Sequence, residues 1–364
     1  MSQTLVPARV SSPGRILSRE LDARGWTQKD LAVIVERPPQ TINEIVKGKK
    51  QITPETAMDL AAALGTSAEF WTNLEANYRL HLAQKEAGQS SGDSSISRRG
   101  RLYSLAPIPE MVKRGWIEGA DSIDKLEKAV CDFFGVVRIE EAVQLAVNCR
   151  QSEVFEAEGR AQIAWVKRVE NLVRNREVAV FDRAKLRDAI PDLLEYARKA
   201  EDVALVPQKL ASLGVHFAIV PHLQKTYLDG AAFYVEGTPV VALTLRHKRI
   251  DNFWFTLMHE LGHIVAGHKG SYLDNMENLA VTEEEAEANQ LAADWLLEPQ
   301  DLSEFVAETS PYFSTKKVQQ FSISQNRHPG ILAGRLHREE LIPYKNHRKF
   351  LVKVDRYLEG WIAQ

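Results

Sequence analysis

The stretch FWFTLMHELGHIVAGHKG, residues 253–270, places ionisable side chains inside an otherwise apolar run. His259 and His263 are four residues apart, and residues at this spacing share one face of an α-helix. Ionisable groups are rarely buried unless they are paired or bind a metal. The stretch therefore predicts a buried helix that carries a functional site, and the rest of the chain has to fold around it.

The spacing of these residues suits zinc chemistry. His259 and His263 could direct two imidazole nitrogens at one Zn²⁺ ion. Glu260, one position along, could reach water bound to that ion without being a ligand itself. Zinc would acidify the water and the carboxylate would accept its proton. Because H-E-x-x-H also occurs by chance and histidine pairs occur in ordinary cores, a third ligand is needed to support a metal site.

A second acidic helix is expected at TEEEAEANQLAADWLLEP, residues 282–299. Its acids could simply favour the positive end of the helix. However, Glu285 lies one turn from Asn289, and Ala288 and Ala292 lie on the adjoining surface of the same helix. Small residues there would let this helix approach the histidine helix closely. The rotation of the helix is not fixed by the sequence, so three carboxylates stay open as the third ligand: Glu284, Glu285 and Glu287.

Near the N-terminus, TQKDLAVIVERPPQTINEIVKGKK predicts two helices joined by a tight turn, as in a helix–turn–helix. Expected helix ends are marked by Thr27 and Thr53 as N-caps and by Gly25 and Gly65 as C-terminal stops. The candidate DNA-binding residues are Gln28, Gln40, Thr41, Asn43, Lys47 and Lys49. Glutamine and asparagine suit base edges, and lysine suits phosphates. The alternative is a helical interaction bundle, and ten basic against nine acidic residues in 1–80 favour neither.

Composition sets outer limits. The chain has 364 residues, 44% hydrophobic and 26% charged, which indicates a soluble globular protein of two or three domains. A net charge of -3 argues against a protein that coats nucleic acid but allows a small DNA-binding module. Cys131 and Cys149 are too few for a disulfide framework and are expected to be buried thiols. Without a membrane span or a secretory leader, we expect a cytoplasmic protein with no membrane partner.

The expected fold class is α+β and mostly helical. An all-α helix–turn–helix domain covers 13–85, a Ser- and Gly-rich linker 86–100, a helical connecting region 101–200, and a domain with a small β-sheet and the H-E-x-x-H helix 201–350. GVHFAIVPHL and GAAFYVEGTPVVALTL predict short strands, with a hairpin at Glu236-Gly237.

Residues 13–80 closely resemble the N-terminal domain of HigA-type antitoxins in the XRE helix–turn–helix family, which has a lambda-repressor-like fold. TINEIVKGKKQIT and LGTSAEFWTNLEANY carry the resemblance. It implies a homodimer that binds double-stranded DNA at its own toxin–antitoxin promoter. Arg37-Pro38-Pro39 departs from the small-residue turn that is more usual in the family.

HELGH followed by EAEANQLAADWLLEP resembles the ImmA/IrrE family of zincin-like metallopeptidase domains, over residues 205–350. The resemblance implies His259, His263 and Glu285 as zinc ligands, Glu260 as general base, and Asn289 as a partner that orients a ligand histidine. His328 recurs in the family and could stabilise an oxyanion, although a loop histidine fixed by Pro329 is an equal alternative. Tyr227 and Tyr234 are weaker oxyanion candidates, and His268 is expected to lie off the ligand face.

Together these features predict a DNA-binding transcriptional regulator with a zinc-dependent endopeptidase domain that hydrolyses a specific protein partner. The alternative is a HigA-like antitoxin and autorepressor whose zinc domain binds a toxin or a ligand without catalysis. A third reading is a zinc-stabilised scaffold. The intact Glu260 favours the enzyme, because a purely structural zinc site does not need it.

Overall fold

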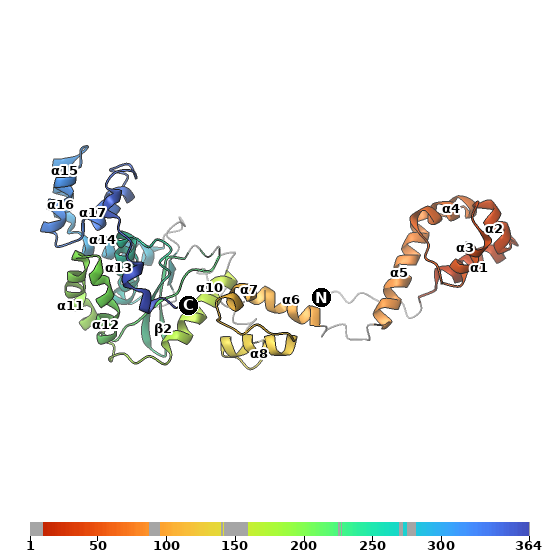
Figure 1. The fold of residues 1–364 in the computed structure, drawn as a ribbon, viewed down its shortest axis with the longest axis horizontal. Coiled ribbons are helices and arrows are strands. Elements are labelled where there is room, and N and C mark those ends of the chain that lie inside the picture. The colour runs from red at the N-terminus through yellow and green to blue at the C-terminus, as the bar shows by residue number, and fades with distance from the viewer. Residues whose placement is uncertain are drawn as a thin grey trace. The chain divides into compact units, whose positions relative to one another are not determined.

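The computed structural model describes residues 10–86, 95–139, 141, 159–224, 226, 228–268, 272–274 and 282–363. The chain forms two compact units, Met1–Ser94 and Ser95–Gln364 (Figure 1). Each unit has hydrophobic core residues of its own. None of the helices among the described residues combines the length and the apolar composition that a bilayer-spanning segment needs.

The described part of the N-terminal unit consists of α1 (Pro13–Arg24), α2 (Gln28–Ile34), α3 (Pro39–Val46), α4 (Pro54–Leu64) and α5 (Ala68–Glu86). The four predicted capping residues are confirmed: Thr27 and Thr53 precede α2 and α4, and Gly25 and Gly65 follow α1 and α4. Thr27 accepts a hydrogen bond from the backbone of Asp30, and the Asp30 carboxylate accepts one from the Thr27 backbone, at 2.7 Å. Gly25 and Gly65 end α1 and α4 with φ 70°, a conformation that glycine adopts without strain.

One core holds this unit together. Each helix contributes at least one large apolar side chain that is 0% exposed: Leu17, Leu31, Ile42, Leu60 and Trp71. Burying a side chain of this kind contributes about 1.5–3 kcal/mol. A Cβ atom on Gly14 would lie only 2.2 Å from the carbonyl oxygen of Val46, so α1 packs directly on the end of α3.

The C-terminal unit is built around a four-stranded sheet. Its strands are β1 (His216–Ile219), β2 (Gly230–Val235), β3 (Thr238–Leu243) and β4 (Tyr272–Asp274), in the order β1-β3-β2-β4. β1 is parallel to β3, whereas β2 is antiparallel to β3 and β4. The predicted hairpin is confirmed: Glu236 and Gly237 have φ 50° and φ 82°, the left-handed values of a two-residue hairpin loop.

Helices surround this sheet, joined in places by short 3-10 turns. They are α6 (Ser95–Leu105), α7 (Ile108–Lys113), α8 (Ile123–Phe134), α10 (Gly159–Val173), α11 (Arg183–Leu194), α12 (Val206–Ser212), α13 (Ile250–Ala266), α14 (Glu283–Leu296), α15 (Pro299–Thr309), α16 (Thr315–Ser324) and α17 (Pro329–Arg338). The 3-10 turns are Glu195–Arg198, Glu201–Leu205, Arg348–Phe350, Asp355–Tyr357 and Glu359–Trp361.

Alternate strand residues serve two different cores. On β3, Val241 and Leu243 join the core that contains α13, whereas Val240 and Ala242 join the core that contains α6, α7, α8 and α10. Successive side chains of a strand point to opposite faces, so both faces of the sheet are covered. Trp165 on α10 ties the second layer to the sheet by donating to the carbonyl oxygen of Val220, at 2.8 Å.

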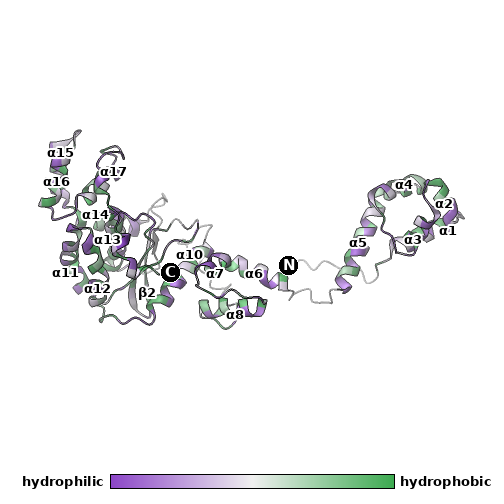
Figure 2. Cartoon of the chain, in the orientation of Figure 1, coloured by the Kyte–Doolittle hydropathy of each residue, from purple (hydrophilic) through white to green (hydrophobic). Residues whose placement is uncertain are grey.

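The region expected to connect two domains is therefore largely a layer of the C-terminal unit. Figure 2 shows hydrophobic and hydrophilic residues alternating along α8. Its hydrophobic side is the buried one, with Leu126, Val130 and Phe134 in the core. Residues 95–100, which the sequence analysis assigned to the linker, are helical and belong to α6.

Candidate metal centre and DNA-binding surface

The two histidines of the H-E-x-x-H stretch lie on one face of α13. Their side chains are 1% exposed, and their Nε2 atoms are 3.0 Å apart. α14 packs closely against this helix, because a Cβ atom on Gly262 would lie 3.2 Å from the Cα atom of Ala288. Gly262 thus makes room for the neighbouring backbone rather than for a metal, and the small residues of α14 allow the predicted close approach.

Glu285 is the carboxylate of α14 that meets the histidines. Its Oε2 is 3.2 Å from Nε2 of His259, and its Oε1 is 3.4 Å from Nε2 of His263. Ligand atoms of these three residues all lie within 4.8 Å of one another. Glu284 is exposed, and Glu287 instead contacts His268. Of the three carboxylates left open by the sequence, the structure brings Glu285 to the histidines. We call His259, His263 and Glu285 the triad.

The triad has the donor set and the size of a zinc site. Zinc takes imidazole nitrogen and carboxylate oxygen at about 2.0–2.1 Å, so ligand atoms of a tetrahedral site are about 3.4 Å apart. The separations in the triad, 3.0, 3.2 and 3.4 Å, are close to that value. The residues present therefore fit the ion.

The pKa shifts of His263 and Glu285 favour the protonation states that metal binding needs. Burial lowers the pKa of His263, which keeps the imidazole neutral. Burial raises the pKa of Glu285, but interactions with His259 and His263 outweigh it and hold this pKa at about 2. Neutral imidazoles and an ionised carboxylate are the forms that bind a cation.

Glu260 is fully buried beside the triad without belonging to it. The start of β2 makes room for its carboxylate: a Cβ atom on Gly230 would lie 2.5 Å from Oε1 of Glu260 and 2.7 Å from Cγ2 of Thr256. Any residue other than glycine would displace this carboxylate. Gly230 is thus a residue of the site that sequence reasoning missed.

His268 is a second residue that the sequence analysis undervalued. It lies off the ligand face, as expected, but its Nδ1 is 3.0 Å from Nδ1 of His263, and its Nε2 is 3.2 Å from Oε2 of Glu287. α13 ends at Gly267, whose φ of 82° turns the chain back and places His268 beside the last turn. A glycine that ends a helix turns the chain back, so the residue after it often packs on the last helical turn. A histidine directly after such a glycine therefore predicts a contact of this kind.

The other residues implied by the resemblance lie elsewhere. Asn289 accepts a hydrogen bond from Arg338 of α17 at 3.4 Å, and no described contact joins it to a triad histidine. Tyr234 is 38% exposed on β2, four residues beyond Gly230 and thus about 13 Å along the strand. Tyr227 and Cys149 lie outside the described residues, and Cys131 is buried as expected.

His328 caps a helix instead of facing the triad. Its Nδ1 accepts a hydrogen bond from the backbone nitrogen of Gly330 at 3.0 Å, at the first turn of α17. Gly330 packs against Ile250, since a Cβ atom there would lie 2.6 Å from Cγ2 of that residue. Ile250 precedes His259 by nine residues, about 13 Å along α13. The capping contact corresponds to the alternative of a structurally fixed histidine.

In the N-terminal unit, the predicted DNA-binding residues lie mainly on α3 and just after its end, with Gln28 at the start of α2. Gln40, Lys47 and Lys49 are exposed, and Gln28 and Asn43 are partly exposed. The placement of Thr41 on the outer face is wrong: it is only 9% exposed, next to the core residue Ile42. Helix α3 turns Thr41, Ile42 and Ile45 inward together, as their spacing of one and four residues allows.

The turn before α3 contains the unusual Arg37-Pro38-Pro39 sequence. Arg37 links this turn to α4, because its Nε donates a hydrogen bond to Oδ2 of Asp59, at 2.7 Å. Glu36 has φ 50°, a left-handed conformation that costs most residues free energy. Pro39 then begins α3 at a position where its missing N–H is not needed.

Two known sequence families match this chain. A helix-turn-helix family matches residues 17–71, and a peptidase M78 family, described as the IrrE N-terminal-like domain, matches residues 215–324. The uncharacterized HTH-type transcriptional regulator YddM of Escherichia coli (strain K12) is 33% identical over 92 residues, which are 25% of this chain and 90% of that protein. Virulence-associated protein I of Dichelobacter nodosus is 36% identical over 75 residues, 20% of this chain and 69% of that protein.

Solved structures of HigA-type antitoxins are similar to the N-terminal part. The addiction module antidote protein of the HigA family from Coxiella burnetii is 35% identical, and Pseudomonas aeruginosa antitoxin HigA, solved with the higBA promoter, is 32% identical. The alignments cover 22% and 23% of this chain, and 89% and 92% of those chains, with a TM-score of 0.22 in both.

The helix–turn–helix unit and the unit around the triad define a DNA-binding regulator that carries a peptidase-like domain. Through its N-terminal unit the chain belongs to the HTH-type transcriptional regulators of the XRE family. Its C-terminal unit contains an IrrE N-terminal-like domain of peptidase family M78. Both family resemblances noted in the sequence are thereby confirmed.

Proposed function

We propose that this protein is a homodimeric repressor of its own promoter and that its C-terminal unit, loaded with zinc, is a peptidase that cleaves one specific protein partner. The observation that carries the proposal is the buried triad with Glu260 beside it. A structural zinc site would be closed by a fourth protein ligand and would need no proton acceptor beside it, whereas three ligands are typical of catalytic sites. A fully buried carboxylate next to the triad, in a space kept open by Gly230, suits proton transfer.

The residues divide the chemical work between them. His259, His263 and Glu285 would hold the ion, which supplies a Lewis acid for the peptide carbonyl and acidifies water. The Glu260 carboxylate takes the proton of the attacking water. It then delivers that proton to the nitrogen of the leaving amine, so that the broken peptide bond ends as a carboxylate and an amine. His268 keeps the ring of His263 in place while this happens.

A specific partner is a more suitable substrate than bulk polypeptide. The DNA-binding unit in the same chain ties the activity to one promoter, and a partner encoded there would be present with the regulator. Repression would use α3 of each subunit on a two-fold symmetric site. The antitoxin-like alternative shares this DNA binding but holds its partner without cutting it.

The test uses Glu260→Gln, because glutamine keeps the shape of the side chain but cannot accept the proton. We expect unchanged zinc content and DNA binding, while partner cleavage falls about 10²–10⁴-fold, as for a lost general base. The wild type and the variant are each co-expressed with the candidate partner, and mass spectrometry reports the length of that partner. A stable, uncleaved complex with both proteins would favour the antitoxin-like binder.

A further inference from the structure

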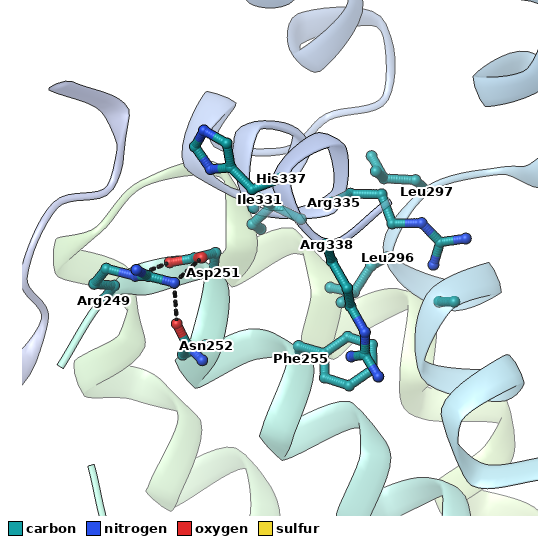
Figure 3. Close-up of a pocket in the computed structure, with 12 residues that line it drawn as sticks. Arg249, Asp251, Asn252, Phe255, Leu296, Leu297, Ile331, Arg335, His337 and Arg338 are labelled. Carbon is teal, nitrogen blue, oxygen red and sulfur yellow. Dashed lines mark hydrogen bonds and ion pairs between the residues drawn. The ribbon is translucent and has the colours of Figure 1, made fainter. Parts of the chain in front are cut away.

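A hollow of about 340 Å³ lies between the first half of α13, the end of α14 and helix α17 (Figure 3). Small-molecule sites typically have about 300–1,000 Å³, with apolar walls and a few polar groups. Apolar side chains of Phe255, Leu296, Leu297 and Ile331 form part of this wall. The hollow has the size and the lining of a ligand site, and neither the triad nor the DNA-binding helices account for it.

Gly334 brings α17 into close contact with α13 at the edge of the hollow. A Cβ atom on Gly334 would lie 2.5 Å from Cβ of Asp251, so the two helices touch there. One turn further along the same face, Arg338 reaches across instead, and its guanidinium carbon lies 4.1 Å from the centre of the Phe255 ring (Figure 3). Gly334 and Arg338 both line the hollow, which therefore lies beside this close contact of the two helices.

The charges around the hollow favour an anion. Three arginines line it, Arg249, Arg335 and Arg338, and they outnumber the two carboxylates paired with them: Asp251 with Arg249, and Glu339 with Arg335 at 2.5 Å. Asp251 is held by Arg249 through two hydrogen bonds, at 3.1 and 2.9 Å. Guanidinium groups bind carboxylates through paired, planar hydrogen bonds, and such contacts are strong where water is partly excluded.

We propose that this hollow binds a carboxylate carried on a short apolar stem, with Arg338 as its main partner and the apolar wall around the stem. A free organic acid and the C-terminal end of a peptide both present this chemistry. The site adjoins the triad: Arg338 donates to Asn289, one turn beyond Glu285, and the Phe255 ring stacks on the ring of His259 with centres 6.4 Å apart. A ligand bound at Arg338 and Phe255 would therefore contact side chains that touch both helices of the triad, α14 through Asn289 and α13 through His259.

Isothermal titration calorimetry on the full chain tests this inference without any reference to cleavage. The probes are hexanoate, as a free acid, and acetyl-Leu-Leu-Leu, as a chain end, each compared with its amide. We expect saturable binding of at least one acid and about tenfold weaker binding of its amide, which is typical for the loss of one charge-assisted hydrogen bond. Binding by hexanoate alone assigns a free acid, and binding by the peptide alone assigns a chain end.

Variants locate the binding. Arg338→Gln should weaken the acid about tenfold or more, whereas Arg338→Lys keeps the charge and should retain part of the affinity. Arg187→Gln, which removes an exposed arginine of α11 outside the hollow, should leave binding unchanged. If circular dichroism shows that Arg338→Gln is unfolded, Arg335→Gln takes its place. Equal affinity for acid and amide, unchanged binding in the glutamine variants, or no binding of either acid would overturn the proposal.

Discussion

Nδ1 of His268 lies 3.0 Å from Nδ1 of His263, on the side of the His263 ring that faces away from Glu285. If Nε2 of His263 offers its lone pair to a metal, its Nδ1 must carry the proton and donate it to His268. His268 then carries its own proton on Nε2 and donates to Glu287, at 3.2 Å. This chain of hydrogen bonds selects the ring tautomer that a metal ligand needs.

His268→Ala should therefore weaken zinc binding without removing a ligand. We expect about a 10–100-fold loss of affinity, the range found when such supporting partners are lost. Competition with a chromophoric chelator measures it, with His247→Ala, an exposed histidine of the same unit, as the matched control. Equal zinc affinity in both variants would contradict the supporting role of His268.

Glu285→Ala should abolish tight zinc binding, whereas Glu284→Ala should keep it. The two residues are neighbours on α14, but only Glu285 reaches the histidines. Elemental analysis of protein purified without added metal should give about one zinc per chain for the wild type and for Glu284→Ala. Full zinc content in Glu285→Ala would show that the carboxylate is not a ligand.

DNA binding should respond differently to changes at Asn43 and at Lys47. Asn43→Ala is expected to relax sequence preference, with a loss of about 1–3 kcal/mol on the preferred site. Lys47→Ala should weaken binding to every sequence and lower its salt dependence. Fluorescence anisotropy with the upstream region and with scrambled DNA measures both effects. Thr41→Val is the control, because the buried Thr41 is not expected to contact DNA.

Glu36→Gly should stabilise the N-terminal unit. The left-handed conformation of Glu36 costs about 1–2 kcal/mol, and the added freedom of glycine in the unfolded chain removes about 0.5–1 kcal/mol of that gain. A net gain of about 0.5–1 kcal/mol should raise the melting temperature of this unit by a few degrees in calorimetry. Gly25→Ala, the reverse change at φ 70°, should lower it.

Features decided by neighbouring residues could be predicted from the sequence. Thr27 and Gly65 define helix ends, and Gly237 allows a hairpin turn, because each acts on the backbone within a few residues. The histidine pair belongs to the same class, since its spacing alone puts both rings on one face of α13.

Features decided by packing could not be predicted in this way. The choice of Glu285 depends on the rotation of α14, which is set where Ala288 meets Gly262. The space around Glu260 depends on Gly230, a residue of a strand thirty positions earlier in the chain. Thr41 was misplaced because its polarity indicated the surface, although α3 turns it toward the core along with Ile42.

One face of the sheet is covered by α6, α7, α8 and α10, and this limits which segments of the chain can be transferred between proteins and still fold. The matched peptidase-like segment, residues 215–324, contains Phe233 and Val240 but lacks α6, α7, α8 and α10, which cover them. A gene fusion that transferred this segment alone would leave an apolar face open to water and prone to aggregate. The piece that can be exchanged between regulators begins near Ser95, so recombination that preserves folding has to carry the covering helices with the strands.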